Sequence, residues 1–135
     1  MASNRLWGNR DTKVVVLDTS AILMLFEFSI KLDDELTMLV GKNRMILPKQ
    51  VVKELKLLST RGDGRKASFA KASLNMLKNF DVEDIEAEDA DSSVLNLAKK
   101  YDGIIVTNDR ELRKRAKEEK LSVVYLRGMG KLVLE

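Results

Sequence analysis

Two acidic residues each follow a short run of apolar, mostly β-branched side chains. Asp18 comes directly after the run Val-Val-Val-Leu at 14–17, and Asp109 comes shortly after the run Ile-Ile-Val at 104–106. Such runs predict strands that are buried on both faces, as in a parallel sheet. Because ligands of open α/β sheets bind at the carboxyl ends of the strands, we expect these two carboxylates to converge at one edge.

Two further acids belong to predicted helices. Asp91 falls in the first turn of a helix that begins at Ala90, on the side that faces the core. Glu54 lies three residues after Val51 and four before Leu58, so it flanks an apolar stripe. A capping box does not explain Glu54, because no Ser or Thr stands three residues before it.

Four carboxylates at one edge of a sheet repel one another and raise each other's pKa. One or two Mg²⁺ or Mn²⁺ ions, which prefer oxygen ligands, would remove that repulsion. Such ions activate water for phosphodiester hydrolysis, and Ser20, Thr107 and Asn108 would orient the ligands. The spacing leaves a second interpretation open, in which Asp18 and Asp109 are helix N-caps and Asp91 serves its own helix dipole.

The residue types that are missing narrow the chemistry further. The 135 residues include neither cysteine nor histidine. This excludes disulfides, thiolate zinc sites, cysteine nucleophiles, imidazole bases and Ser-His-Asp triads. An enzyme of this composition must use carboxylates, lysines, hydroxyls or a metal held by oxygen. The formal net charge of +3 is a weak bias toward polyanionic partners.

The rest of the pattern alternates strands with helices. Strands are predicted at 14–17, 45–47, 104–106, 122–126 and 131–134. Helices are predicted at 21–28, 32–40, 48–58 with Pro48 as first helical residue, about 65–79, 90–101 and after Asp109. The basic, glycine-rich segment 59–66 is expected to be a mobile loop, and 80–89 an acidic connector with a short edge strand. This order predicts a three-layer α/β/α sandwich around a mostly parallel sheet, closed by a short C-terminal hairpin strand.

Length and composition fit one domain at 13–135, preceded by a flexible arm at 1–12. No apolar run is as long as a membrane span, and the first residues lack the apolar core of a secretory signal. We therefore expect a cytoplasmic protein with no membrane partner.

Four motifs, taken in order, resemble those of the PIN-domain ribonucleases. They are VLDTSA at 16–21, LP followed by VVKEL at 47–55, DAD followed by VL and A at 89–98, and VTNDREL at 106–112. The match extends from about Val14 to the C-terminus. TNDREL at 107–112 and YLRG at 125–128 are similar to small single-domain archaeal PIN proteins, relatives of the nucleases that process small-subunit ribosomal RNA.

The resemblance implies an endoribonuclease that uses Mg²⁺ or Mn²⁺ and often forms homodimers. By position, its acidic quartet would be Asp18, Glu54, Asp91 and Asp109. Asp18, Asp91 and Asp109 would hold the principal metal, while Glu54 would share a second metal or orient the attacking water. Ser20 would occupy the hydroxyl position of the family. Because the chain lacks cysteine, it cannot carry the zinc ribbon of one ribosomal branch.

A basic cluster follows the last acid and is predicted to bind RNA. It consists of Arg110, Arg113, Lys114 and Arg115. Positive charge beside a metal ligand would guide a phosphate backbone. The alternative is an ordinary solvated helix face, since three glutamates are interspersed.

Two other functions remain open at this stage. The fold could bind RNA or a ribosome-assembly partner without cutting, or it could be a toxin ribonuclease paired with an antitoxin. A receiver domain and a dehalogenase-like phosphatase are disfavoured, because the first strand is followed by Asp-Thr-Ser rather than by paired acids or Asp-x-Asp. No glycine-rich phosphate loop follows Leu17.

Overall fold

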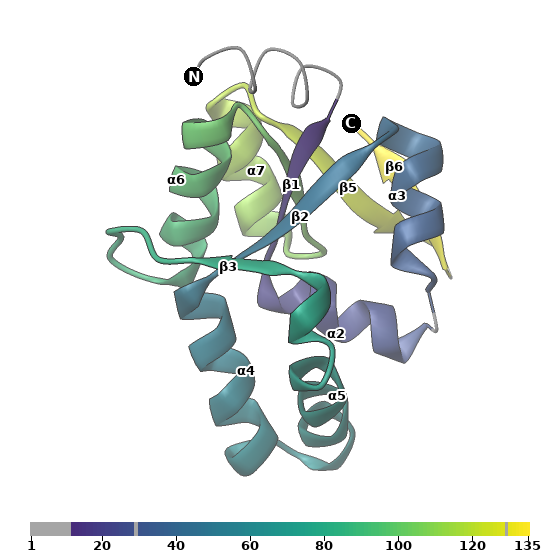
Figure 1. The fold of residues 1–135 in the computed structure, drawn as a ribbon, viewed down its shortest axis with the longest axis vertical. Helices are drawn as coiled ribbons and strands as arrows, with labels where there is room; N and C mark the ends of the chain where they lie inside the picture. The colour runs from purple at the N-terminus through teal and green to yellow at the C-terminus, as the bar shows by residue number, and fades with distance from the viewer. Residues whose placement is uncertain (1–11, 29, 129) are drawn as a thin grey trace.

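A six-stranded sheet forms the centre of the protein in this computed structural model, which describes residues 12–28, 30–128 and 130–135 (Figure 1). Its strands are β1 (Lys13–Leu17), β2 (Asn43–Pro48), β3 (Asp81–Glu83), β4 (Ile104–Val106), β5 (Ser122–Arg127) and β6 (Lys131–Leu134). The order across the sheet is β3-β2-β1-β4-β5-β6. Every neighbouring pair is parallel except β5 and β6, which are antiparallel. The predicted mostly parallel sheet with a C-terminal hairpin strand is confirmed.

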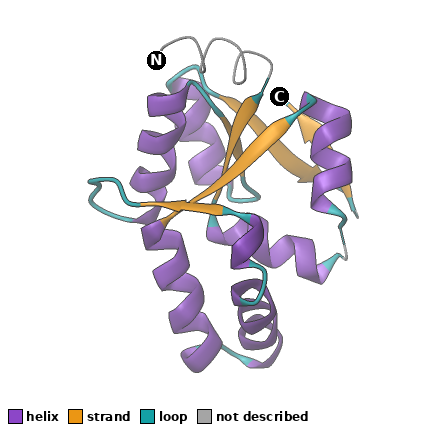
Figure 2. Cartoon of the chain, in the orientation of Figure 1, coloured by secondary structure: helices purple, strands orange, loops and turns teal. Residues whose placement is uncertain are grey.

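Helices cover both faces of this sheet. They are α2 (Thr19–Glu27), α3 (Leu32–Val40), α4 (Lys49–Arg61), α5 (Gly64–Leu74), α6 (Ala90–Tyr101) and α7 (Arg110–Glu118), with one 3₁₀ turn, η1 (Leu77–Asn79). Figure 1 shows α6 and α7 on one side of the sheet and α3 on the other, with the pair α4 and α5 extending beyond it. Figure 2 shows the connector 84–89 as a loop that projects away from the sheet. Because helices cover both faces of the sheet, the predicted three-layer α/β/α sandwich is confirmed.

Strand β1 is buried on both faces because it lies in the middle of the sheet. Val15, Val16 and Leu17 point alternately to the two faces, and all three are fully buried. Leu17 pairs with Val106, so β1 and β4 end side by side. The residues that follow these two strands therefore start from adjacent positions at one edge.

The turn between α6 and β4 packs directly against β1. Asp102 adopts a left-handed conformation with φ of 51°, and Gly103 donates a 2.8 Å backbone hydrogen bond to Ala98. A Cβ atom at Gly103 would lie 2.8 Å from the carbonyl oxygen of Val14, closer than atoms approach. Glycine thus allows one end of α6 to lie against β1, and this contact fixes the helix that carries Asp91.

Some predicted boundaries are wrong. Pro48, which was predicted as the first helical residue, instead ends β2 and lies at the N-cap of α4, so that the helix begins one position later at Lys49. The predicted loop 59–66 shrinks to two residues between α4 and α5, because Ser59 is buried and its hydroxyl donates to Lys56 within α4. The helix predicted at about 65–79 stops at Leu74, and a turn leads into η1.

The predicted arm 1–12 lies outside the described residues, apart from Thr12. Within the described chain, none of the helices has the length and apolar character needed to cross a membrane.

Candidate active site

Asp18 is a buried carboxylate at the end of β1, with 4% of its surface exposed. Its Oδ1 atom caps α2 by accepting a 2.8 Å hydrogen bond from the backbone N–H of Ala21. The hydroxyl of Ser20 donates to the same carboxylate at 2.9 Å, and that of Thr107 donates to Oδ2 at 2.5 Å. Burial nevertheless raises the pKa of Asp18 to about 6, because these hydrogen bonds offset desolvation only in part.

Two hydroxyl groups connect the ends of β1 and β4. Ser20 Oγ accepts a 3.0 Å hydrogen bond from the backbone N–H of Asn108, and Thr107 Oγ1 accepts one of 3.0 Å from that of Asp109. Both hydroxyls therefore link Asp18 to the loop after β4. Ser20 and Thr107 both donate hydrogen bonds to Asp18, whereas the contribution of Asn108 is its backbone N–H.

The three other predicted acids line the same cleft as Asp18, although they come from three other elements. Glu54, an exposed residue of α4, accepts a short hydrogen bond from the hydroxyl of Thr19. Asp91 lies half-buried in the first turn of α6. Asp109 caps α7, where its Oδ1 accepts hydrogen bonds from two backbone N–H groups at 2.8 and 3.1 Å.

These acids are close enough to influence one another electrostatically. Burial raises the pKa of Asp91, and the charges of Asp109, Asp89 and Glu54 raise it further, while Arg115 opposes them. Asp91 in turn contributes to the raised pKa of Asp18. The cleft therefore concentrates negative charge, which Arg115 offsets only in part at Asp91.

Helix capping explains only part of this arrangement. Asp18 and Asp109 cap α2 and α7, as the second interpretation of the sequence required. The cap of α6 is Asp89, however, which accepts a 2.8 Å hydrogen bond from the backbone N–H of Ser92. Asp91 serves no cap but lies in the first turn of α6, where its charge favours the helix dipole as the second interpretation required. Glu54 has neither role, so its place beside the other acids needs another explanation.

A divalent cation fits the chemistry of these donors. In the described part of the chain, no three acidic side chains are arranged to hold a metal ion by themselves. Each of three carboxylates instead contacts its own donors: Asp18 binds two hydroxyls and a backbone N–H, Glu54 binds Thr19, and Asp109 binds its helix. Mg²⁺ usually takes one or two carboxylates and completes its shell with water and substrate phosphate. A charge-rich cleft whose side-chain donors are all oxygen atoms suits that mode of binding.

The cleft also has an apolar part that was not predicted. Leu23 from α2 lines it together with Leu57 and Leu58 from α4, and half of the surface of Leu57 is exposed. Thr19 was missed as well, because its contact with Glu54 joins residues 35 apart in sequence. Helical spacing after Glu54 was the available signal for the two leucines of α4.

The predicted RNA-binding cluster on α7 is divided between two faces of the helix. Arg115 points toward α6 and lies 3.4 Å from the hydroxyl of Ser92. Arg113 lies over the ring of Tyr125, 3.8 Å from its centroid, and pairs with Glu135 at 3.2 Å. The other two members, Arg110 and Lys114, are exposed, and they line a shallow basic hollow together with Arg113.

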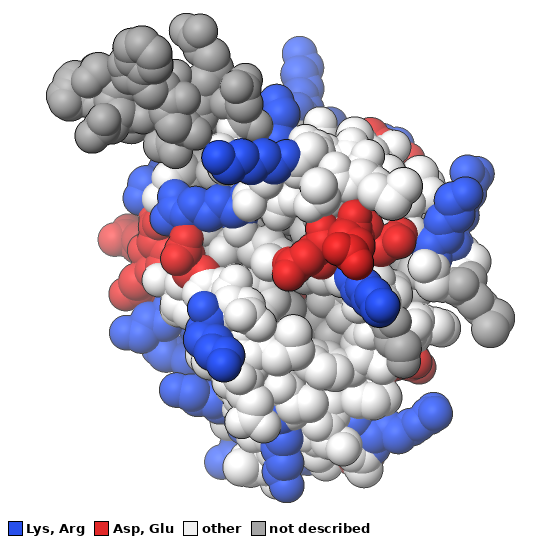
Figure 3. All heavy atoms as spheres, turned by 45° about the vertical axis from the view of Figure 1, so that its right-hand side comes forward, with Lys and Arg blue, Asp and Glu red and all other residues white. Residues whose placement is uncertain are grey.

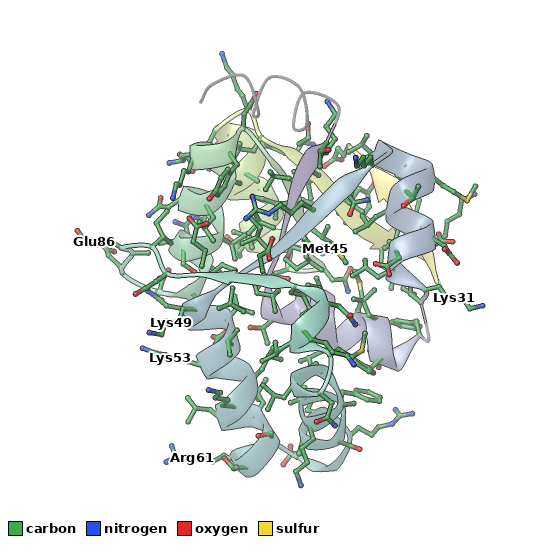
Figure 4. All side chains as sticks on the ribbon, in the orientation of Figure 1. Lys31, Met45, Lys49, Lys53, Arg61 and Glu86 are labelled. Carbon is green, nitrogen blue, oxygen red and sulfur yellow. The ribbon has the colours of Figure 1, made fainter. Side chains whose placement is uncertain are left out.

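A second basic row was not predicted and lies on α4. Figure 4 shows Lys49, Lys53 and Arg61 along the outer side of this helix, pointing away from the body of the protein. All three are exposed. Their spacing of four and eight residues was a usable signal, since residues four apart share a helix face.

A separate apolar hollow lies between α2, α3 and α5. Its lining includes Leu25, Phe26 and Phe80, and its rim includes acids from the first turn of α3. Figure 3 shows acidic side chains gathered on the face that carries α3. This hollow shares no lining residue with the carboxylate cleft, and the acids on its rim have the opposite charge to the cations of α7.

Comparison with known proteins agrees with the fold. A family model described as a PIN like domain matches residues 15–129. Ribonuclease VapC9 of Archaeoglobus fulgidus is 28% identical over 127 residues, which cover 94% of this chain and 93% of the relative. Ribonuclease VapC4 of Methanocaldococcus jannaschii is 29% identical over 117 residues, covering 84% and 89%.

Solved structures share the architecture at lower sequence identity. The PIN domain endonuclease Utp24 superposes with a TM-score of 0.72 at 19% identity and covers 90% of each chain. A chain from the structure of VapBC2 from Rickettsia felis bound to a promoter DNA fragment superposes with a TM-score of 0.63 at 14% identity. The match covers 84% of this chain and 99% of that one. The resemblance seen in the motifs is confirmed. Since the family model spans most of the chain and the fold agrees, this protein is a member of the PIN-like domain family.

Proposed function

We propose that this protein is a metal-dependent endoribonuclease. The observation that carries the proposal is the single cleft lined by Asp18, Glu54, Asp91 and Asp109, which come from four separate parts of the chain. Two relatives that match most of this chain are named ribonucleases. The lack of cysteine and histidine leaves oxygen-bound metal as the economical way to activate water.

In the proposed site, Asp18, Asp91 and Asp109 would hold a Mg²⁺ or Mn²⁺ ion together with water and substrate phosphate, and Glu54 would share a second ion or orient the attacking water. A bound ion supplies a water of lowered pKa and stabilises charge that develops on the phosphate. The hydroxyls of Ser20 and Thr107 keep the carboxylate of Asp18 fixed. The reaction leaves 5′-phosphate and 3′-hydroxyl ends.

Surface charge supports a path for the RNA backbone along α4 and α7. Both helices border the cleft and carry exposed cations on their outer faces. The first turn of α3 instead carries three acids, Asp33, Asp34 and Glu35. Phosphates are repelled from that face and attracted to the other two helices.

Two cellular roles fit this reaction. The motif resemblance favours processing of ribosomal RNA, and the near full-length match to two VapC proteins favours a toxin whose partner is an antitoxin. Expression in a bacterial host distinguishes them: growth arrest by the wild type, absent with Asp18→Asn, supports the toxin. Sedimentation of the purified protein tests the expected homodimer.

The decisive experiment is cleavage of a structured RNA by purified protein with Mn²⁺, with Mg²⁺ and with EDTA. Asp18→Asn and Asp91→Asn should each abolish cleavage while circular dichroism shows a folded protein. Asp33→Asn, an exposed acid of α3, is the matched control and should cut normally.

The outcomes separate the competing functions. Metal-dependent cutting that both variants lose supports the nuclease, and 2′,3′-cyclic phosphate ends would contradict the proposed chemistry. Tight RNA binding without cutting across several RNAs would instead identify a binding or ribosome-assembly factor that retains the fold.

A further inference from the structure

The carboxylate cleft has two chemically different ends. Asp18 and Asp109 follow β1 and β4 at the sheet edge, Thr19, Ser20 and Asp91 lie in the first turns of α2 and α6, and Glu54 lies in the middle of α4. One helical turn further along, Leu23 follows Thr19 by four residues, and Leu57 and Leu58 follow Glu54 by three and four. One helical turn, about 5 Å along the helix axis, therefore separates the leucines from Thr19 and Glu54.

The apolar end is open to solvent rather than part of the core. Leu57 exposes 50% of its surface, and Leu23 and Leu58 are only partly buried. The remaining apolar lining comes from Val51 and Ala90, and among the described residues no aromatic, amide or basic side chain lines the cleft. An isolated exposed leucine needs no explanation, but three that line the cleft of the carboxylates form a surface suited to an apolar group.

We propose that Leu23, Leu57 and Leu58 form a subsite for one unpaired nucleobase, that of a nucleotide adjacent to the cleaved phosphate. The inference rests on the proposed function and deepens it. A phosphate held at the carboxylates leaves its neighbouring base about one helical turn away, on the leucines. The face of the base would pack on these side chains, because aliphatic groups offer no hydrogen bonds to its edges.

Two properties of the substrate follow. The subsite does not distinguish the four bases, since recognition of a base requires donors or acceptors that the leucines lack. The base must also leave its stack to enter the cleft, so the nucleotide at this position has to be unpaired. A loop, bulge or single strand meets this requirement, and an intact duplex does not.

A double-mutant cycle between protein and RNA tests the contact. Leu57→Ala and wild type are compared on a short RNA with one preferred cleavage position and on matched RNAs that carry an abasic nucleotide on either side of it. Met38→Ala removes another exposed apolar side chain, on α3, and serves as the matched control. Cleavage with Mn²⁺ and equilibrium binding with Ca²⁺ are both measured.

Leu57→Ala should raise KM on the intact RNA about fivefold, somewhat less than the loss of an aromatic stacking partner. For wild type, an abasic nucleotide on one side of the cleavage position should raise KM by the same factor. On that abasic RNA, Leu57→Ala should raise KM no further. Met38→Ala should match wild type on every RNA. Equal effects of Leu57→Ala on intact and abasic RNA, or no effect on either, would overturn the subsite.

The same experiment separates this inference from the nuclease itself. A wild type that cuts with Mn²⁺ but shows no coupling keeps the proposed function and refutes the subsite. A wild type that binds without cutting refutes the nuclease, and the binding cycle then decides the base contact. Absence of both cleavage and binding refutes both.

Discussion

The hydroxyl of Thr107, at the end of β4, donates a 2.5 Å hydrogen bond to Oδ2 of Asp18, at the end of β1. The same hydroxyl accepts from the backbone N–H of Asp109. One side chain thus joins the buried carboxylate of the first strand to the residue that caps α7. This contact also lowers the pKa of Asp18, against the larger effect of burial.

Replacing Thr107 with valine should destabilise the protein by roughly 1–3 kcal/mol, the cost of leaving buried polar groups unpaired. Valine has nearly the same shape as threonine but can neither donate to Asp18 nor accept from Asp109. Denaturant unfolding measures the change. Thr107→Ser keeps the hydroxyl and is the control; equal stability of the valine variant and wild type would show that the contact contributes nothing.

In the metal-free protein, the free energy of unfolding should fall as the pH rises from about 4 to about 6. Burial raises the pKa of Asp18 from 3.8 to about 6, so in this interval the folded state holds a proton that the unfolded state has released. The contribution of this proton to the free energy of unfolding is complete below the pKa of Asp18 in the unfolded state. It is lost as the pH rises through the pKa of Asp18 in the folded state, by about 3 kcal/mol in total. Denaturant unfolding in EDTA across this range measures the trend.

Asp18→Asn is the matched variant for this pH dependence, because it cannot ionise and keeps an oxygen that can cap α2. The difference in stability between wild type and variant should change sharply between the two pH limits. A difference that stays constant with pH would contradict the assignment to this carboxyl.

Mn²⁺ should raise the unfolding temperature at pH 7. An ion that binds only the folded state at a hundred times its dissociation constant stabilises it by about 3 kcal/mol. Differential scanning fluorimetry with and without EDTA measures the shift. Asp91→Asn should abolish it, whereas Asp33→Asn removes an equal charge from α3 and should retain it; a shift that survives in Asp91→Asn would place the ion elsewhere.

Thr19→Val should reduce cleavage roughly tenfold, as expected for the loss of a partner that orients a metal-site carboxylate. The hydroxyl of Thr19 is the donor that holds Glu54 at the cleft. Thr19→Ser should restore activity. Combined with Glu54→Gln, the valine change should add little, and Mn²⁺ affinity measured by calorimetry should follow the same pattern. Fully additive effects would mean that the two residues act separately.

Lys114→Ala should weaken RNA binding and lower the slope of log affinity against log salt by about 1, because one phosphate contact is lost. Fluorescence anisotropy at several salt concentrations measures both. Lys78→Ala removes an exposed lysine of η1, outside α4 and α7, and should leave the slope unchanged. A slope that falls equally in both variants would indicate only a general effect of net charge.

The strands could be predicted from the sequence because burial on both faces demands continuous β-branched runs such as 14–17. The parallel arrangement followed from the alternation of strands and helices. The segment 59–66 was misjudged because its glycines and charges favour a loop locally. Burial of Ser59 and the pairing of α4 with α5 outweigh that local preference, and neither is visible in the sequence.

The candidate site was predictable where it depends on strand ends and less so where helices meet. Asp18 and Asp109 follow adjacent strands, so their convergence follows from topology alone. The contact of Thr19 with Glu54 requires the relative placement of α2 and α4, which no local pattern contains. The separation of Arg115 from Lys114 was predictable, because successive helical residues point about 100° apart.

The position of β1 in the centre of the sheet has a consequence for synthesis of the protein. The ribosome releases Asp18 early, yet its partner Thr107 lies 89 residues later in the chain. Strand β1 needs both β2 and β4 as neighbours, so most of the polypeptide must emerge before the sheet can close. A nascent or truncated chain that ends before β4 holds the first carboxylate without its hydroxyl partner or the last acid. Assembly of the cleft is therefore tied to near-completion of translation, and under the proposed function a fragment that ends before β4 should not cleave RNA.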